Sequence, residues 1–170
     1  MVNYKISYMP KRSDYLGIVL ILAGFFADIG TKLLASSIAT GKDIIPGILK
    51  FSVVKNTGLA FSMLKSQPYA ALALNAIVFI LLVVIWWKLG LTFLAISIGG
   101  AAGNLIERIV TGGVTDFISV LQFPIFNVGD SLIFIGIALT IIFHGRKMSP
   151  NSPIQGIQGQ TIRETQIIRK

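Results

Sequence analysis

The chain of 170 residues contains no cysteine and a single histidine, His144. Without cysteine there can be no disulfide, no thiolate nucleophile and no Cys-ligated metal, and one imidazole cannot build a His-based metal site alone. We therefore predict neither a metal nor a cofactor. Any catalysis must use carboxylates, hydroxyls, amines or amides.

Charged residues are also scarce, at 13%, whereas 54% of the residues are hydrophobic and the mean hydropathy is +0.77. This usage is far from that of a soluble domain and predicts a membrane protein. The net charge of +8 does not indicate a nucleic-acid partner, because no basic run exceeds two residues and no basic face interrupts the apolar segments. The positive charge instead suits anchoring to anionic membrane lipid.

Four stretches are apolar and long enough to cross the ~30 Å hydrocarbon core as helices, over residues 15–37, 69–87, 91–110 and 128–144. The first is too long for the apolar part of a signal peptide and lacks a clear cleavage site, so we expect it to be retained. The sequence thus predicts an all-α membrane protein, a four-helix transmembrane bundle in one domain over residues 1–144. Residues 145–170, rich in Gly, Pro, Ser and Gln, are expected to form a partly flexible cytoplasmic tail.

The lysines and arginines that flank these spans are unequally distributed between the two sides. The side that holds both termini carries Lys5, Lys11, Arg12, Lys88, Arg146, Lys147, Arg163, Arg169 and Lys170. The opposite side carries Lys42, Lys50, Lys55 and Lys65. Because cytoplasmic loops carry the excess of basic residues, this distribution predicts cytoplasmic termini.

The loop between the first two spans, residues 38–68, mixes β-branched and aromatic residues with turn-prone Asn and Gly. Its segments 51–56 and 58–62 have the composition of strands. We expect a small β-sheet there, on the extracytoplasmic side of the membrane.

Polar side chains inside the predicted spans all fall near the external end. An ionisable group at the bilayer centre costs at least ~2.5–3.5 kcal/mol, so each one is a functional hypothesis. A transporter would normally place its site near the midplane, often at broken helices in related repeats, and the sequence has neither. The cluster therefore indicates chemistry at one membrane face, and it consists of Asp28, Lys32, Asn75, Asn104, Glu107, Arg108, Asn127 and Asp130.

Asp28 and Lys32 are four residues apart and can form an ion pair along one helix face. We favour this structural interpretation over a serine–lysine mechanism, because Ser36 and Ser37 are poorly spaced from the lysine.

The predicted third span carries a face of small residues, Gly99, Gly100 and Gly103, which lets it pack closely on a neighbouring helix. Asn104 and Arg108 also share one helix face. They either line a functional site or form a helix-end arginine beside a hydrogen-bonded asparagine.

Asp130 follows Asp116 by 14 positions, with Pro124 between them. Because Pro124 interrupts any helix there, this segment can fold back and bring both carboxylates to the mouth of the bundle. Two carboxylates that share a proton can act as base and acid in peptide hydrolysis. Alternatively, Asp116 caps a surface helix and Asp130, with Asn127, caps the last span. Spacing alone leaves both interpretations open.

Several segments together resemble the lipoprotein signal peptidase family, also called type II signal peptidase. They follow the family's order from about residue 15 to 145, and their combination is far more specific than any one segment. The matching segments are Asp28 with Thr31 and Lys32, residues 56–62 (NTGLAFS), residues 100–104 (GAAGN) with Arg108, residues 113–117 (GVTDF) and residues 123–130 (FPIFNVGD).

The resemblance implies that Asp116 and Asp130 are the catalytic pair of an aspartic endopeptidase. It implies a supporting set that lines the active site and holds the substrate, namely Asn56, Gly58, Asn104, Arg108 and Asn127. The implied reaction removes the signal peptide from a diacylglyceryl-modified prolipoprotein, immediately before its lipidated cysteine. The implied fold has four transmembrane helices, a small extracytoplasmic sheet and a surface helix over the site, in the bacterial cytoplasmic membrane.

Two positions depart from the family's usual pattern: Glu107 stands where aspartate is usual, and Gly129 where alanine is usual. The expected partners are the lipidated precursor and membrane lipid, and we expect a monomer. Two alternatives remain open from the residues themselves. One is a small proton- or ion-coupled transporter in which acidic residues relay charge, and the other is a non-catalytic membrane subunit.

Overall fold

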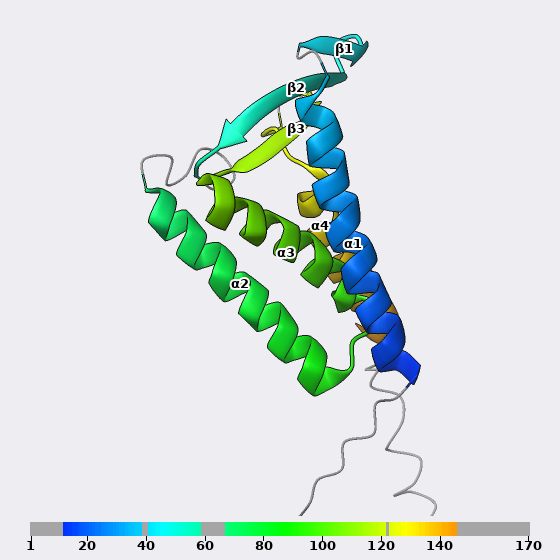
Figure 1. Cartoon of the computed structure of the whole chain (residues 1–170). Coiled ribbons are helices and arrows are strands. Elements are labelled where there is room, and N and C mark those ends of the chain that lie inside the picture. Colours follow the sequence, from blue (N-terminus) through cyan, green and yellow to red (C-terminus); the bar gives the residue numbers. More distant parts are fainter. Residues whose placement is uncertain (1–11, 39–40, 59–66, 122, 146–170) are drawn as a thin grey trace, which may run out of the picture. The chain divides into compact units, whose positions relative to one another are not determined.

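The computed structural model describes residues 12–38, 41–58, 67–121 and 123–145. They form, in chain order, α1 (Arg12–Ser36), β1 (Lys42–Ile45), β2 (Leu49–Asn56), α2 (Pro68–Leu89), α3 (Leu94–Thr111), β3 (Val114–Val120) and α4 (Val128–Gly145) (Figure 1). The chain divides into two compact units, Met1–Thr140 and Ile141–Lys170. The fold described below is that of the first unit.

The four helices lie where the apolar stretches predicted them, with ends that differ by a few residues. Helix α1, over Tyr15–Ser36, and helix α2, over Pro68–Leu89, are long and apolar enough to cross a membrane. The apolar part of α4, Val128–His144, is shorter. Many apolar side chains of these helices are exposed on the protein, including Leu33, Leu34, Ile80 and Phe134. Such surfaces suit contact with lipid hydrocarbon.

Helix α3 forms the centre of the unit, and more than half of its residues are buried. Small residues bring its neighbours close: a Cβ on Gly99 would lie 2.6 Å from the carbonyl oxygen of Ile21 in α1, and one on Gly100 would clash with the Gly129 carbonyl of α4. A cluster of Leu82, Leu94, Ile98 and Ala101 fills the core between α2 and α3. The glycine face predicted for close packing therefore contacts two helices.

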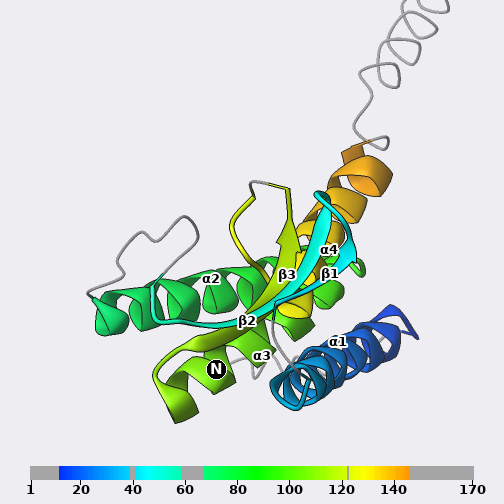
Figure 2. The ribbon, with the colours of Figure 1, turned by 90° about the horizontal axis from the view of Figure 1, so that it is seen from above.

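The strands form an antiparallel sheet of order β1-β2-β3 at one end of these helices (Figures 1 and 2). The predicted strand over residues 51–56 falls within β2, whereas most of the predicted strand 58–62 lies outside the described residues. The described residues contain no helix besides α1–α4, so the surface helix implied by the resemblance has no counterpart in them.

The sequence did not predict β3, which contains Asp116. Gly112 ends α3 in the left-handed conformation, with φ of 73°, and its N–H donates to the Arg108 carbonyl at 3.0 Å. The chain then turns directly into β3, which pairs with β2. Asp116 therefore lies in a strand, so the alternative interpretation in which it caps a surface helix is wrong.

After β3 the chain folds back on itself, as the proline-containing segment predicted. The N–H of Ile118 donates to the Phe126 carbonyl at 2.8 Å, and the N–H of Phe126 donates to the Ile118 carbonyl at 3.0 Å. This short pairing leads straight into α4. It thereby brings the first turn of α4 beside β3.

Candidate active site

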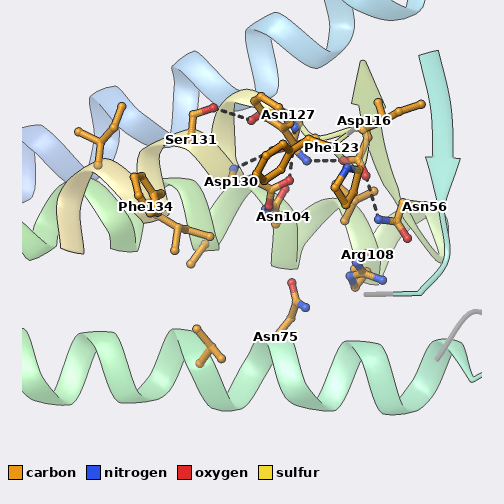
Figure 3. Close-up of a pocket in the computed structure, with 18 of the residues that line it drawn as sticks. Asn56, Asn75, Asn104, Arg108, Asp116, Phe123, Asn127, Asp130, Ser131 and Phe134 are labelled. Carbon is orange, nitrogen blue, oxygen red and sulfur yellow. Dashed lines mark hydrogen bonds between the residues drawn. The ribbon is translucent and has the colours of Figure 1, made fainter. Parts of the chain in front are cut away.

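Asp116 is buried, with 3% of its surface exposed, and both of its carboxylate oxygens accept hydrogen bonds from side-chain amides. Asn56 Nδ2 donates to Oδ2 at 2.8 Å, and Asn127 Nδ2 donates to Oδ1 at 2.6 Å (Figure 3). In the β2–β3 register Asp116 lies opposite Val54, so Asn56 is its diagonal neighbour on the same face of the sheet. Asn56 is itself oriented by the N–H of Gly58, which donates to Asn56 Oδ1 at 3.0 Å.

Asp130 lies in the first turn of α4 and is also held by neutral donors. Asn104 Nδ2, from α3, donates to Asp130 Oδ1 at 2.9 Å. The backbone N–H of Asn127 donates to Asp130 Oδ2 at 3.3 Å, while the N–H of Asp130 donates to Asn127 Oδ1 at 2.9 Å. Asn127 thus caps α4 in a reciprocal arrangement with Asp130.

Asn127 joins the two carboxylates, which we call the carboxylate pair. Its side-chain amide binds Asp116 and its backbone amide binds Asp130. The sequence left open whether Asn127 caps the helix or orients a carboxylate, and the structure has it doing both. Its complete burial fixes this arrangement.

Burial raises the pKa of Asp116 from 3.8 to about 6. The hydrogen bond from Asn56 opposes this rise, and the neighbouring negative charge of Asp130 adds to it. A carboxyl group with a pKa near neutrality can exchange a proton during a reaction at physiological pH.

A buried ion pair lies directly behind Asp130. Lys32 Nζ is 2.6 Å from Asp28 Oδ2, and Asp28 Oδ1 accepts the N–H of Gly129 at 2.7 Å. Lys32 Nζ also donates to Asn104 Oδ1 at 2.7 Å. Because lysine can only donate, the Asn104 oxygen must face it, which turns the Asn104 amino group towards Asp130.

Glu107 connects the end of α3 to β3. Its carboxylate accepts the backbone N–H of Thr115 at 3.0 Å and the Thr115 hydroxyl at 2.6 Å, and it forms salt bridges with Lys32 at 3.2 Å and Lys55 at 3.1 Å. Since Thr115 immediately precedes Asp116, the glutamate fixes the backbone that carries one member of the carboxylate pair.

Arg108 is buried, with 6% exposed, yet Nε and Nη1 of its guanidinium have no hydrogen-bond partner among the described residues. Buried donors without partners are costly. They are usually explained by a water or by a ligand that the site is built to bind. Arg108 lines the same cavity as the carboxylate pair.

The carboxylate pair faces a cavity of about 910 Å³. One part of its wall is polar and consists of Asn56, Asn104, Arg108, Asp116, Asn127 and Asp130. The remainder is largely apolar, with Leu74 and Val78 from α2 and Ile133, Phe134 and Ile137 from α4. Such a cavity suits a ligand with a long apolar part and one polar segment.

Sequence reasoning missed several contacts of this site. It placed Lys32 in an ion pair but did not connect it to Asn104, and it gave Glu107 no role. It recorded Asn75 as polar and external without assigning it to a site, although Asn75 lines the cavity. The signal that could have found Asn75 is its isolation, since it is the one amide in α2 and, with Lys88 in the last turn, one of the few polar residues of that helix.

The fold is similar to that of solved bacterial membrane enzymes. One such structure, determined in meso at 2.3 Å resolution, matches with a TM-score of 0.65 and 28% identity, covering 85% of this chain and 94% of that chain. A second, at 1.9 Å resolution, matches with a TM-score of 0.61 and 28% identity, covering 84% and 97%. This chain therefore shares its fold with solved bacterial membrane enzymes.

The family model described as signal peptidase II matches residues 20–145. The lipoprotein signal peptidase of Lactococcus lactis subsp. cremoris is 34% identical over 137 residues, which cover 75% of this chain and 91% of that protein. The lipoprotein signal peptidase of Nostoc punctiforme is 35% identical over 147 residues, covering 79% and 91%. The chain therefore belongs to the signal peptidase II family. This membership gives no support to the alternative of a transporter.

Proposed function

We propose that this protein is a membrane aspartic endopeptidase that removes the signal peptide from diacylglyceryl-modified prolipoproteins, cleaving before the lipidated cysteine. The observation that carries the proposal is the carboxylate pair, in which Asp116 is buried and Asp130 half-buried. Asn127 joins the two groups, and both line a largely apolar cavity. Membership in the signal peptidase II family supplies the class of substrate.

The carboxylate pair supports hydrolysis without a covalent intermediate. With one proton shared between the two groups, the ionised carboxylate takes a proton from water as the water oxygen attacks the scissile carbonyl carbon. The protonated carboxyl donates a hydrogen bond to the carbonyl oxygen. The tetrahedral intermediate then collapses when a proton passes to the leaving nitrogen, which frees the amino group of the cysteine and restores the shared proton.

The residues around the pair fix its geometry and receive the substrate. Asn56, Asn104 and Asn127 hold the carboxylate oxygens by neutral amide donors, so the pair can still change its protonation state. The free N–H groups of Arg108 are available to a carbonyl of the bound peptide. The backbone N–H of Gly58 donates to Asn56 Oδ1 and so orients the Asn56 amide.

Four transmembrane helices, with cytoplasmic termini and the carboxylate pair near the external face, are the membrane arrangement that we propose. In this arrangement the domain spans residues 1–144 of a monomer in the bacterial cytoplasmic membrane. A lipidated cysteine keeps its acyl chains in the outer leaflet, so the scissile bond lies level with the carboxylate pair. The apolar side of the cavity then receives the apolar parts of the substrate.

The test is cleavage of a lipidated precursor by purified protein in detergent, comparing wild type with Asp116→Asn and Asp130→Asn. Asp43→Asn is the matched control, because Asp43 lies exposed in β1 and outside the cavity. We expect each pair variant to lose about 10²–10⁴-fold in cleavage rate and the control to keep its rate. Equal cleavage of a precursor without the lipid would refute the substrate assignment, and wild-type rates in both pair variants would refute the mechanism.

A further inference from the structure

Asn75 is a polar side chain in the strongly apolar helix α2. Helix α2 carries no other amide or carboxylate along Pro68–Leu89, and Asn75 lies on its stretch of aliphatic residues. A polar group in a membrane-spanning helix is costly unless it is satisfied or used. Asn75 is half-buried in the wall of the cavity, which indicates that its amide is used to bind a ligand there.

The amide of Asn75 is only half satisfied. Its Nδ2 donates to the carbonyl of Ala71, one turn earlier in the same helix, at 3.2 Å. This bond orients the amide, and Oδ1 accepts no hydrogen bond from the described residues. Figure 3 shows Asn75 pointing from α2 into the cavity, towards the wall that carries Asn104 and Asp130. The residue therefore presents a free acceptor opposite the carboxylate pair.

A bound peptide needs such an acceptor. In a trans peptide unit the C=O and the N–H point in opposite directions. A chain that turns a carbonyl towards the carboxylate pair and Arg108 must turn an N–H towards the opposite wall. That wall is formed by Leu74, Asn75 and Val78, of which only Asn75 can accept a hydrogen bond.

We propose that Asn75 is a substrate-binding residue whose Oδ1 accepts a hydrogen bond from a backbone N–H of the signal peptide beside the cleaved bond. This inference rests on the proposed function, because it takes the peptide precursor as the ligand of the cavity. Asn75 and the carboxylate pair then hold opposite edges of the same peptide segment, which fixes its rotation in the cavity.

The experiment measures binding of lipidated precursor to protein that carries Asp116→Asn, so that the result does not depend on cleavage. Asn75→Leu removes the acceptor at nearly constant size, and Thr140→Val is the control, since Thr140 also bonds to its own helix but does not line the cavity. We expect Asn75→Leu to weaken binding by about 10-fold and Thr140→Val to leave it unchanged. In protein with Asp116 intact, the same loss should appear in KM with kcat retained.

The partner atom is identified with precursors in which one peptide N–H at a time, near the cleaved bond, is replaced by an ester oxygen. One of these esters should bind protein with Asn75 about 10-fold more weakly than the amide precursor does. The same ester and the amide precursor should bind Asn75→Leu with equal affinity. Additive effects at every position, or unchanged binding in Asn75→Leu, would overturn the inference. Failure of wild type to cleave the unmodified precursor would instead refute the proposed function, and the binding comparison would still decide the role of Asn75.

Discussion

Two pairs of ionisable side chains lie in the same region of this protein, and they are held in different ways. Asp28 is neutralised by Lys32 at 2.6 Å. Asp116 and Asp130 have no salt-bridge partner among the described residues and accept hydrogen bonds from neutral amides instead. A carboxylate bonded to a cation holds its charge, whereas one held by neutral donors can take up a proton. The comparison supports a structural role for the first pair and, together with the proposed function, a catalytic role for the second.

The largest expected effect on stability comes from breaking the first pair. Lys32→Met leaves the Asp28 carboxylate buried without its cation and removes the donor that orients Asn104, so we expect a loss of about 3–5 kcal/mol in the free energy of unfolding. Denaturation in detergent, followed by tryptophan fluorescence, measures this loss. The double variant Asp28→Asn/Lys32→Met should be less destabilised than Lys32→Met. If the double variant is the less stable of the two, the ion-pair account is wrong.

A smaller loss is expected from filling the space that α3 leaves for Asp28. A Cβ on Gly103 would clash with Asp28 Oδ2, while one on Gly30, also in a helix, would meet nothing within 4 Å. We expect Gly103→Ala to cost about 1–3 kcal/mol and Gly30→Ala to gain about 0.5–1 kcal/mol. Thermal unfolding of the two variants checks this contrast. Equal shifts in both would mean that the Asp28 carboxylate does not need the space at Gly103.

Replacing a carboxylate of the second pair should raise the free energy of unfolding instead of lowering it. The pKa of Asp116 is raised from 3.8 to about 6, so its contribution to stability is fully present below pH 3.8 and is lost as the pH rises through 6. At pH 7.5 the ionised carboxylate is a net cost. This rise in pKa corresponds to about 3 kcal/mol. The asparagine amide has one oxygen, so it keeps only one of the two hydrogen bonds that Asp116 accepts, which costs about 1–2 kcal/mol. We therefore expect Asp116→Asn to raise the free energy of unfolding at pH 7.5 by about 1–2 kcal/mol, measured as a higher unfolding temperature.

The pH dependence separates this effect from a general improvement in packing. Near pH 4 the Asp116 carboxyl is protonated in the folded protein, so the advantage of Asp116→Asn should disappear there. Unfolding temperatures measured at both pH values test it. A variant that is less stable than wild type at pH 7.5 would show that the Asp116 carboxylate contributes to folding, as the carboxylate of Asp28 does.

Sequence reasoning located the helices well, because the length of an apolar stretch is a local property. It also predicted a set of site residues, largely through ordered segments that resemble the family. Five of them line one cavity, namely Asn56, Asn104, Asp116, Asn127 and Asp130. It did not predict β3, since the pairing of Asn56 with Val114 joins segments 58 positions apart and β3 itself is only seven residues long.

The contacts of Lys32 and Glu107 could not be predicted for a similar reason. One helix offers Lys32 a partner at Asp28, and helical spacing finds that partner. The contact of Lys32 with Asn104 depends on how closely α1 and α3 approach, which the glycines of both helices decide. The bonds from Thr115 to Glu107 depend on the turn at Gly112. Such features follow from tertiary packing rather than from local pattern.

The most direct test of the distinction between the two pairs is cleavage and unfolding measured on one preparation of Asp116→Asn. The account predicts that the cleavage rate falls by about 10²–10⁴-fold, while the unfolding temperature at pH 7.5 stays at or above that of wild type. A preparation that unfolds like wild type and still cleaves the lipidated precursor at the wild-type rate would contradict it.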